Sequence, residues 1–179
     1  DLNNTSTGTI IVRDTADIQT TAANDGTFQG GEIYLSATST FQNNGTLQID
    51  QLFQPTAGAT FASTTGVIDF VGTDDNKLLD AGIYSPLSVR AMKFNSAIAS
   101  NSIILGTDVQ VTDSVEFNSG RVNYATTGDS LIVLSGGVVT ADTNGSGYMV
   151  ETLYRYPGVV GELMRFPVGD ASPKYRPFW

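Results

Sequence analysis

Carboxylates are the only reactive side chains that this sequence offers in quantity. It contains 18 acidic and 9 basic residues, and it has neither histidine nor cysteine. Without those two residue types the chain cannot form a Ser-His-Asp or Cys-His nucleophile or the usual zinc sites. It also lacks the glycine-rich loops that hold phosphate groups. We therefore predict no catalytic and no cofactor-binding residues, and a protein that is not an enzyme.

The densest acidic cluster lies at Asp74 and Asp75, and Asp69, Lys77 and Asp80 are close to it in the sequence. Carboxylate oxygens are ligands that calcium prefers, and solenoid polysaccharide lyases combine such acids with calcium and a Lys or Arg base. An exposed turn has the same composition. We expect a solvated turn at this cluster, with a calcium site at Asp74 and Asp75 as the alternative.

Any such residues must be positioned by strands, because no segment shows apolar residues at helical spacing over three turns. Short alternating strands follow a recurring glycine, and these nearly evenly spaced glycines are Gly8, Gly26, Gly45 and Gly66. A second element ends in a phenylalanine before two of them, at Phe41 and Phe61. We align Phe117, which precedes Gly120, with the same position.

A period of roughly 20 residues, with short strands and polar corners, is typical of a β-solenoid. One coil cannot bury its own apolar face, but coils stacked about 4.8 Å apart bury a continuous column. We therefore predict an all-β parallel β-helix in which Phe41 stacks on Phe61 and Ile49 on Phe70. Asn and Gly should form the corners because they tolerate positive φ. An antiparallel β-sandwich is the alternative, since short, closely spaced strands fit it too.

Composition predicts a division of the chain after residue 147. Arg13 is the only cation before Lys77, whereas the last stretch is aromatic and basic. We expect a solenoid over residues 1–147, followed over residues 148–179 by an aromatic and basic β segment that leads into a further β domain. The missing initial Met and the two aromatic residues at the end indicate a piece cut from a longer protein.

The last third of the chain contains an ordered series of short motifs. They are Phe117–Val122, Leu131–Gly136, Tyr148–Arg155, Phe166–Asp170 and Tyr175–Pro177. In this order they resemble the large repetitive cell-surface proteins of Bacteroidota that leave the cell through the type IX secretion system. The resemblance implies a β-helix-like stalk in an adhesin-like protein.

Three Asp-Ser/Thr-apolar sequences also resemble the sites that Bacteroidota O-glycosylate. Their hydroxyl groups belong to Thr15, Ser114 and Ser130. A glycan would need each of these side chains exposed.

Charge and hydropathy restrict the partners. The net charge of −9 argues against nucleic acid, because a phosphate backbone would be repelled. The sequence has no apolar run long enough to predict insertion into a membrane. We expect an extracellular or cell-surface location, no cofactor, and extracellular matrix, glycans, neighbouring surface proteins or the secretion machinery as partners.

The function that we predict is a structural stalk or adhesin-like segment of a secreted bacterial surface protein. Two alternatives stay open. One is a carbohydrate-active or glycan-binding solenoid with a carboxylate and calcium groove, and the other is a cargo segment bound to a secretion apparatus. An enzyme should gather three or more acids with a Lys or Arg in one groove, whereas a stalk should scatter them.

Overall fold

The computed structural model describes residues 2–73, 77–79, 86–126, 128–142, 146–150, 153–157 and 167, with the backbone alone for residues 77–79. Strands and turns account for the regular structure of these residues, and none of them is helical. The strands are β1 (Leu2–Asn4), β2 (Thr9–Ile18), β3 (Thr21–Asn24), β4 (Thr27–Leu35), β5 (Thr40–Asn43), β6 (Thr46–Pro55), β7 (Thr60–Phe70), β8 (Lys77–Leu79), β9 (Leu87–Asn95), β10 (Ser102–Leu105), β11 (Val109–Tyr124), β12 (Leu131–Val133), β13 (Val138–Ala141), β14 (Gly147–Met149) and β15 (Leu153–Arg155).

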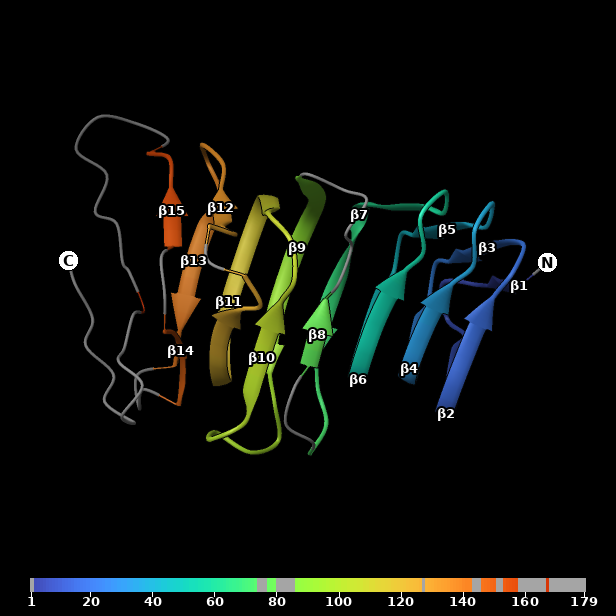
Figure 1. Cartoon of the computed structure of the whole chain (residues 1–179), viewed down its shortest axis with the longest axis horizontal. Helices are drawn as coiled ribbons and strands as arrows, with labels where there is room; N and C mark the ends of the chain where they lie inside the picture. Colours follow the sequence, from blue (N-terminus) through green and yellow to red (C-terminus); the bar gives the residue numbers. More distant parts are fainter. Residues whose placement is uncertain are drawn as a thin grey trace.

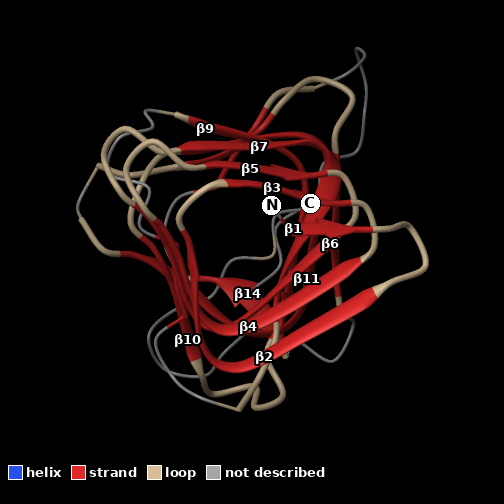
Figure 2. Ribbon diagram, turned by 90° about the vertical axis from the view of Figure 1, so that its right-hand side faces the viewer, coloured by secondary structure: helices blue, strands red, loops and turns tan. Residues whose placement is uncertain are grey.

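The chain winds into a parallel β-solenoid of about seven turns, which runs from β1 and β2 at one end to β15 at the other (Figure 1). Viewed along the axis, the strands line three sides of a prism (Figure 2). The first face contains β1, β3, β5, the starts of β7, β9 and β11, and then β12 and β15. The second face contains the starts of β2, β4 and β6, the ends of β7 and β9, the middle of β11, and β13. The third contains the ends of β2, β4 and β6, then β8, β10, the end of β11, and β14.

The predicted parallel β-helix is confirmed, and the β-sandwich alternative is wrong. All strand pairs among the described residues are parallel, and Phe41 aligns with Phe61 and Ile49 with Phe70. On the second face, Thr9, Thr27, Thr46 and Val67 align on successive coils, and each of them directly follows one of the four recurring glycines. The repeat is visible in the sequence because each coil must place the same side-chain types over those of the coil before.

Aromatic columns fill the prism. The rings of Phe41 and Phe61 lie 5.9 Å apart between centroids on the first face. On the second face, Phe94 stacks on Phe70 at 5.5 Å and on Phe117 at 5.1 Å. Our alignment of Phe117 with Phe41 and Phe61 is therefore wrong, since Phe117 belongs to the second face. The later coils are longer than the early ones, and this difference shifts the later motifs to another side of the prism.

A ladder of buried amides lines the corner between the first and second faces. The Nδ2 of Asn4 donates to the Oδ1 of Asn24 at 2.8 Å, and Asn24 donates in the same way to Asn43 at 2.8 Å. Asn43 then donates to the Oγ of Ser63 at 3.0 Å. Each Nδ2 also donates to a backbone carbonyl, of Thr27, Thr46 or Val67. The ladder satisfies polar groups that the tight corner withdraws from water.

Positive φ does not explain the glycines of this corner, contrary to our expectation. The described residues with positive φ are Thr38, Gly58, Gly72, Gly120, Gly128 and Gly136. At Gly45 the reason is space, because a Cβ there would lie 2.0 Å from the carbonyl oxygen of Gly26 in the coil before. Stacked corners bring backbone so close to backbone that only glycine fits.

Strand pairing continues on both sides of residue 147, and the domain boundary that we predicted there stays a prediction. β14 pairs with the end of β11, and β15 pairs with β12. Tyr148 and Met149 are buried. Residues 158–166 and those from 168 onward lie outside the described residues, so the predicted further domain is untested. No helix long and apolar enough to span a membrane occurs in the part of the chain that the structure describes.

Candidate functional site

One row of charged and polar side chains crosses the outer surface of the second face. Gln48, Asp69, Lys93 and Glu116 occupy aligned positions on four successive coils, because Gln48 pairs with Asp69, Asp69 with Lys93, and Lys93 with Glu116. Each side chain alternates with a buried residue of the core. We call these four residues the charged row. They come from the four strands β6, β7, β9 and β11, so only the winding of the chain brings them together.

Ion pairs neutralise most of the charge in and beside the charged row. The Nζ of Lys93 lies 3.1 Å from the Oε2 of Glu116. At the neighbouring corner the Nη2 of Arg90 lies 2.8 Å from the Oδ2 of Asp113. Both pairs are partly exposed, and such pairs contribute little to stability. Together with Asp69, they place three acids and two bases on adjacent coils.

Asp69 is the unusual member of the charged row. Its side chain is only 7% exposed, although its position faces outward. Its Oδ1 is buried without a hydrogen-bond partner, and its Oδ2 accepts from the Nε2 of Gln48 at 3.4 Å. Burial raises the pKa of Asp69, and the Glu116 carboxylate adds to the rise, while Gln48 and Lys93 oppose it. A carboxyl with a raised pKa is a stronger proton acceptor, once ionised, than an ordinary surface acid.

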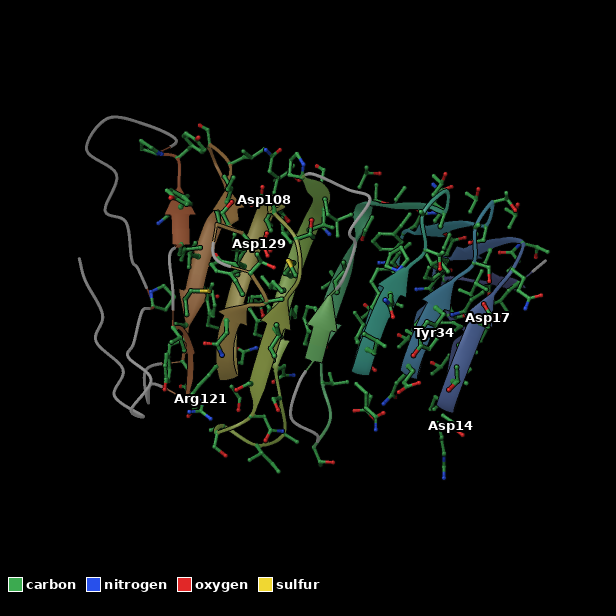
Figure 3. The ribbon with its side chains drawn as sticks, in the orientation of Figure 1. Asp14, Asp17, Tyr34, Asp108, Arg121 and Asp129 are labelled. Atoms are coloured by element: carbon green, nitrogen blue, oxygen red, sulfur yellow. The ribbon has the colours of Figure 1, made fainter. Side chains whose placement is uncertain are left out.

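Other acids of the described residues are distributed along the prism. Asp14 and Asp17 lie near the N-terminal end, and Asp108 and Asp129 lie toward the other end (Figure 3). Asp17 accepts hydrogen bonds from Gln19 and Ser36, both at 2.8 Å, and these bonds lower its pKa. No group of three or more acids in the described ranges is close enough to hold a metal ion.

The predicted calcium ligands Asp74 and Asp75 lie outside the described residues, as does Asp80. The calcium site therefore stays a prediction. Asp69 is the member of that sequence cluster whose side chain the structure does describe, and it belongs to the charged row.

The three predicted glycosylation positions differ in exposure. Thr15 is exposed and Ser114 is half-buried. Ser130 is 8% exposed, and its Oγ donates to the Oδ1 of Asp108 at 2.7 Å. Only Thr15 fully meets the condition of exposure that a glycan requires, and modification itself is untested.

Two tyrosines are exposed near the last described coil. Tyr154 points outward from β15, and Tyr156 follows it. Tyr148, in contrast, is buried in β14. The aromatic residues of this region thus divide between core and surface, which their composition alone does not reveal.

An apolar hollow of about 320 Å³ lies at the N-terminal end of the prism. Its apolar lining includes Leu2, Ile10, Ile18, Ala22 and Phe28. The hollow contains no part of the charged row, so the two features are separate.

No protein-family model, curated protein or solved structure matches the chain. The resemblance to type IX secreted surface proteins of Bacteroidota therefore stays a prediction. The charged row was not predicted as a unit, although Asp69 was named among the candidates. The signal that could have found it is the coil period, since each member lies one coil after the member before it.

Proposed function

We propose that this chain is a rigid spacer, the stalk or adhesin-like segment of a secreted bacterial surface protein. The observation that carries the proposal is the continuous stack of about seven coils with aligned core columns. Because coils repeat at about 4.8 Å, seven of them extend a structure by roughly 34 Å. Each coil contacts its neighbours, so the rod lengthens without a larger core.

The internal ladders support a mechanical role. The amide ladder from Asn4 to Ser63 and the phenylalanine column from Phe70 to Phe117 both run parallel to the axis. Parallel ladders make the coils difficult to slide past one another, because a slip of one residue would turn the core side chains outward. The distribution of most acids along the prism also fits a spacer better than a groove enzyme.

Distance measurement between the two ends tests the proposal. Since the chain contains no cysteine, Asn3→Cys and Tyr154→Cys provide unique positions for spin labels. A rigid spacer gives a narrow distance distribution that persists when the protein is tethered by both ends under load. A broad distance distribution contradicts the spacer role. Unfolding of the prism under a load that an ordinary globular domain withstands contradicts it as well.

Glycan binding or carbohydrate chemistry at the charged row is the second candidate. It is favoured by one observation, the unpartnered buried oxygen of Asp69 beside the ion pair of Lys93 and Glu116. Screening of acidic and neutral oligosaccharides against the chain and against Glu116→Gln tests it. Binding that Glu116→Gln abolishes would support it, whereas binding that is absent or unchanged would leave the spacer role alone. Ser114→Ala, on the same strand, is the matched control.

A further inference from the structure

An asparagine followed by a glycine lies on the outer side of the corner between the first and second faces. These residues are Asn44 and Gly45. In such a pair the backbone nitrogen of the glycine can attack the side-chain amide carbon of the asparagine, because no Cβ obstructs the approach. The new bond closes a five-membered imide and expels ammonia, and water then opens the ring to aspartate or isoaspartate. The other Asn-Gly pair of the sequence, Asn144 and Gly145, lies outside the described residues.

The attacking nitrogen is held by the coil before. The N–H of Gly45 donates to the carbonyl oxygen of Asn24 at 2.8 Å. Attack on Asn44 requires this nitrogen to lose its proton and to turn toward the side chain, so the hydrogen bond has to break first. The backbone also has little room to turn, because a Cβ on Gly45 would lie 2.0 Å from the carbonyl oxygen of Gly26.

The side-chain amide of Asn44 is held from both sides. Its Nδ2 donates to the Oδ1 of Asp25 in the coil before at 2.8 Å. Its Oδ1 accepts from the Oγ1 of Thr65 in the coil after at 3.0 Å, and from the Nε2 of Gln42 at 3.1 Å. Both reacting groups are thus fixed by neighbouring coils, and a local separation of the coils releases them together.

The products of the reaction do not fit the stacked corner. An aspartate at position 44 replaces the amide donor by a second carboxylate beside Asp25, and like charges at hydrogen-bond distance repel each other. An isoaspartate adds a carbon to the backbone directly before Gly45, where the coils already lie in close contact. A converted chain therefore cannot restore the original contacts of this corner.

We propose that Asn44 is a site of spontaneous covalent modification that the stacked coils suppress. While the coils are stacked, Asn44 persists. When they separate, it converts to aspartate or isoaspartate, consuming one water and releasing one ammonia, and the separation becomes irreversible. The proposal does not rest on the spacer role, but in a spacer it would weaken permanently any chain that a load has opened at this corner.

The rate of conversion at residue 44 tests the protection. The parent for this experiment carries Asn144→Ser, so that Asn44 precedes the only remaining glycine of this kind. The chain is incubated in mildly alkaline buffer with and without urea, and peptide mapping by mass spectrometry gives the converted fraction. Conversion should be at least about tenfold slower in the folded chain, because only locally opened molecules react. Equal rates with and without urea would overturn the proposal.

A variant on the neighbouring coil tests whether the contacts to Asn44 provide the protection. Thr65→Val removes the hydroxyl that donates to Asn44 and should speed conversion in the folded chain by about twofold to tenfold. Thr64→Val changes the adjacent exposed threonine and is the matched control, which should convert at the parent rate. In urea all three chains should convert equally. If Thr65→Val is no faster than its control when folded, the contacts across the coils do not protect Asn44.

Refolding tests irreversibility. The parent is held in urea until residue 44 has converted, and the urea is then removed. The converted chain should melt at a lower temperature than unconverted parent, whereas Asn44→Ala in the same background should regain its own melting temperature after the same treatment. Full recovery of the parent melting temperature by the converted chain would refute the irreversible step.

Discussion

At the scale of single residues, this protein depends on polar groups that are satisfied only by the neighbouring coil. The amide ladder is the main example, since each asparagine serves two coils at once. Asp69 is one exception, because its Oδ1 is buried and has no partner. Substitution of a ladder asparagine should lower the stability of the fold, whereas substitution of Asp69 should change how that stability depends on pH.

Asn24→Ala should destabilise the fold by about 3 kcal/mol, because it leaves the Oδ1 of Asn43 and the carbonyl of Thr46 buried without their donor. Chemical denaturation measures this loss. Asn44→Ala is the control, since Asn44 bonds with Asp25 at the exposed side of the same corner. Its cost should stay below about 1 kcal/mol. Equal losses of stability in the two variants would show that the buried ladder contributes no more to stability than an exposed side-chain hydrogen bond.

Asp69→Asn should change the dependence of stability on pH. Because burial raises the pKa of Asp69, the folded state favours the protonated form. The associated stability is complete below the unfolded pKa, near 3.8, and is lost as the pH rises through the folded value. The stability of the variant relative to the parent should therefore increase as the pH rises above the unfolded value. Denaturation at several pH values tests this, and a constant difference would contradict it.

At the scale of elements, successive coils form equivalent turns from different residues. The turns after β4 and after β6 are equivalent, since Ser39 donates to Ser36 and Ala59 donates to Thr56 through the backbone. In the turn after β4, Thr38 has φ +72°, and in the turn after β6, Gly58 has φ +91°. A β-branched residue is strained in this region, whereas glycine is not.

Thr38→Gly should therefore stabilise the protein by about 1 kcal/mol, despite the added flexibility of the unfolded chain. Thermal unfolding measures the gain. Thr40→Gly, two residues away in β5, is the control and should destabilise, because glycine weakens a strand. A loss of stability in Thr38→Gly would mean that the threonine side chain compensates for its backbone conformation.

At the scale of the whole molecule, the coil is the unit of construction. Residues 40–59 form one complete coil, because Thr40 aligns with Thr60 and Phe41 with Phe61. Removing this unit places Thr60 directly after the turn that precedes Thr40. The two coils on either side of the deleted one then stack directly on each other, with the same residue alignment that each had with the deleted coil.

Deletion of residues 40–59 should leave a folded solenoid that is shorter by one rung, about 4.8 Å. Deletion of residues 40–49 removes half a coil and should unfold the chain, since it leaves the first face without a strand in register. Circular dichroism and small-angle scattering distinguish the two outcomes. Unfolding of both variants would show that the coils are not independent units.

The sequence by itself determined the period, the parallel winding and the pairs of residues that stack between neighbouring coils. It could do so because each early coil repeats the same order of glycine, strand and phenylalanine at nearly constant length. Phe41 over Phe61 and Ile49 over Phe70 follow directly from that spacing.

Only the tertiary structure decided which residues share a face once the coils change length. Phe117 lies on the second face, and strand pairing continues past residue 147. Four residues from four strands form the charged row, namely Gln48, Asp69, Lys93 and Glu116. The tertiary structure also showed that the corner glycines are needed for close backbone contact. The physical reason is that a loop of any length can close a coil, so the position along the chain no longer indicates the side of the prism.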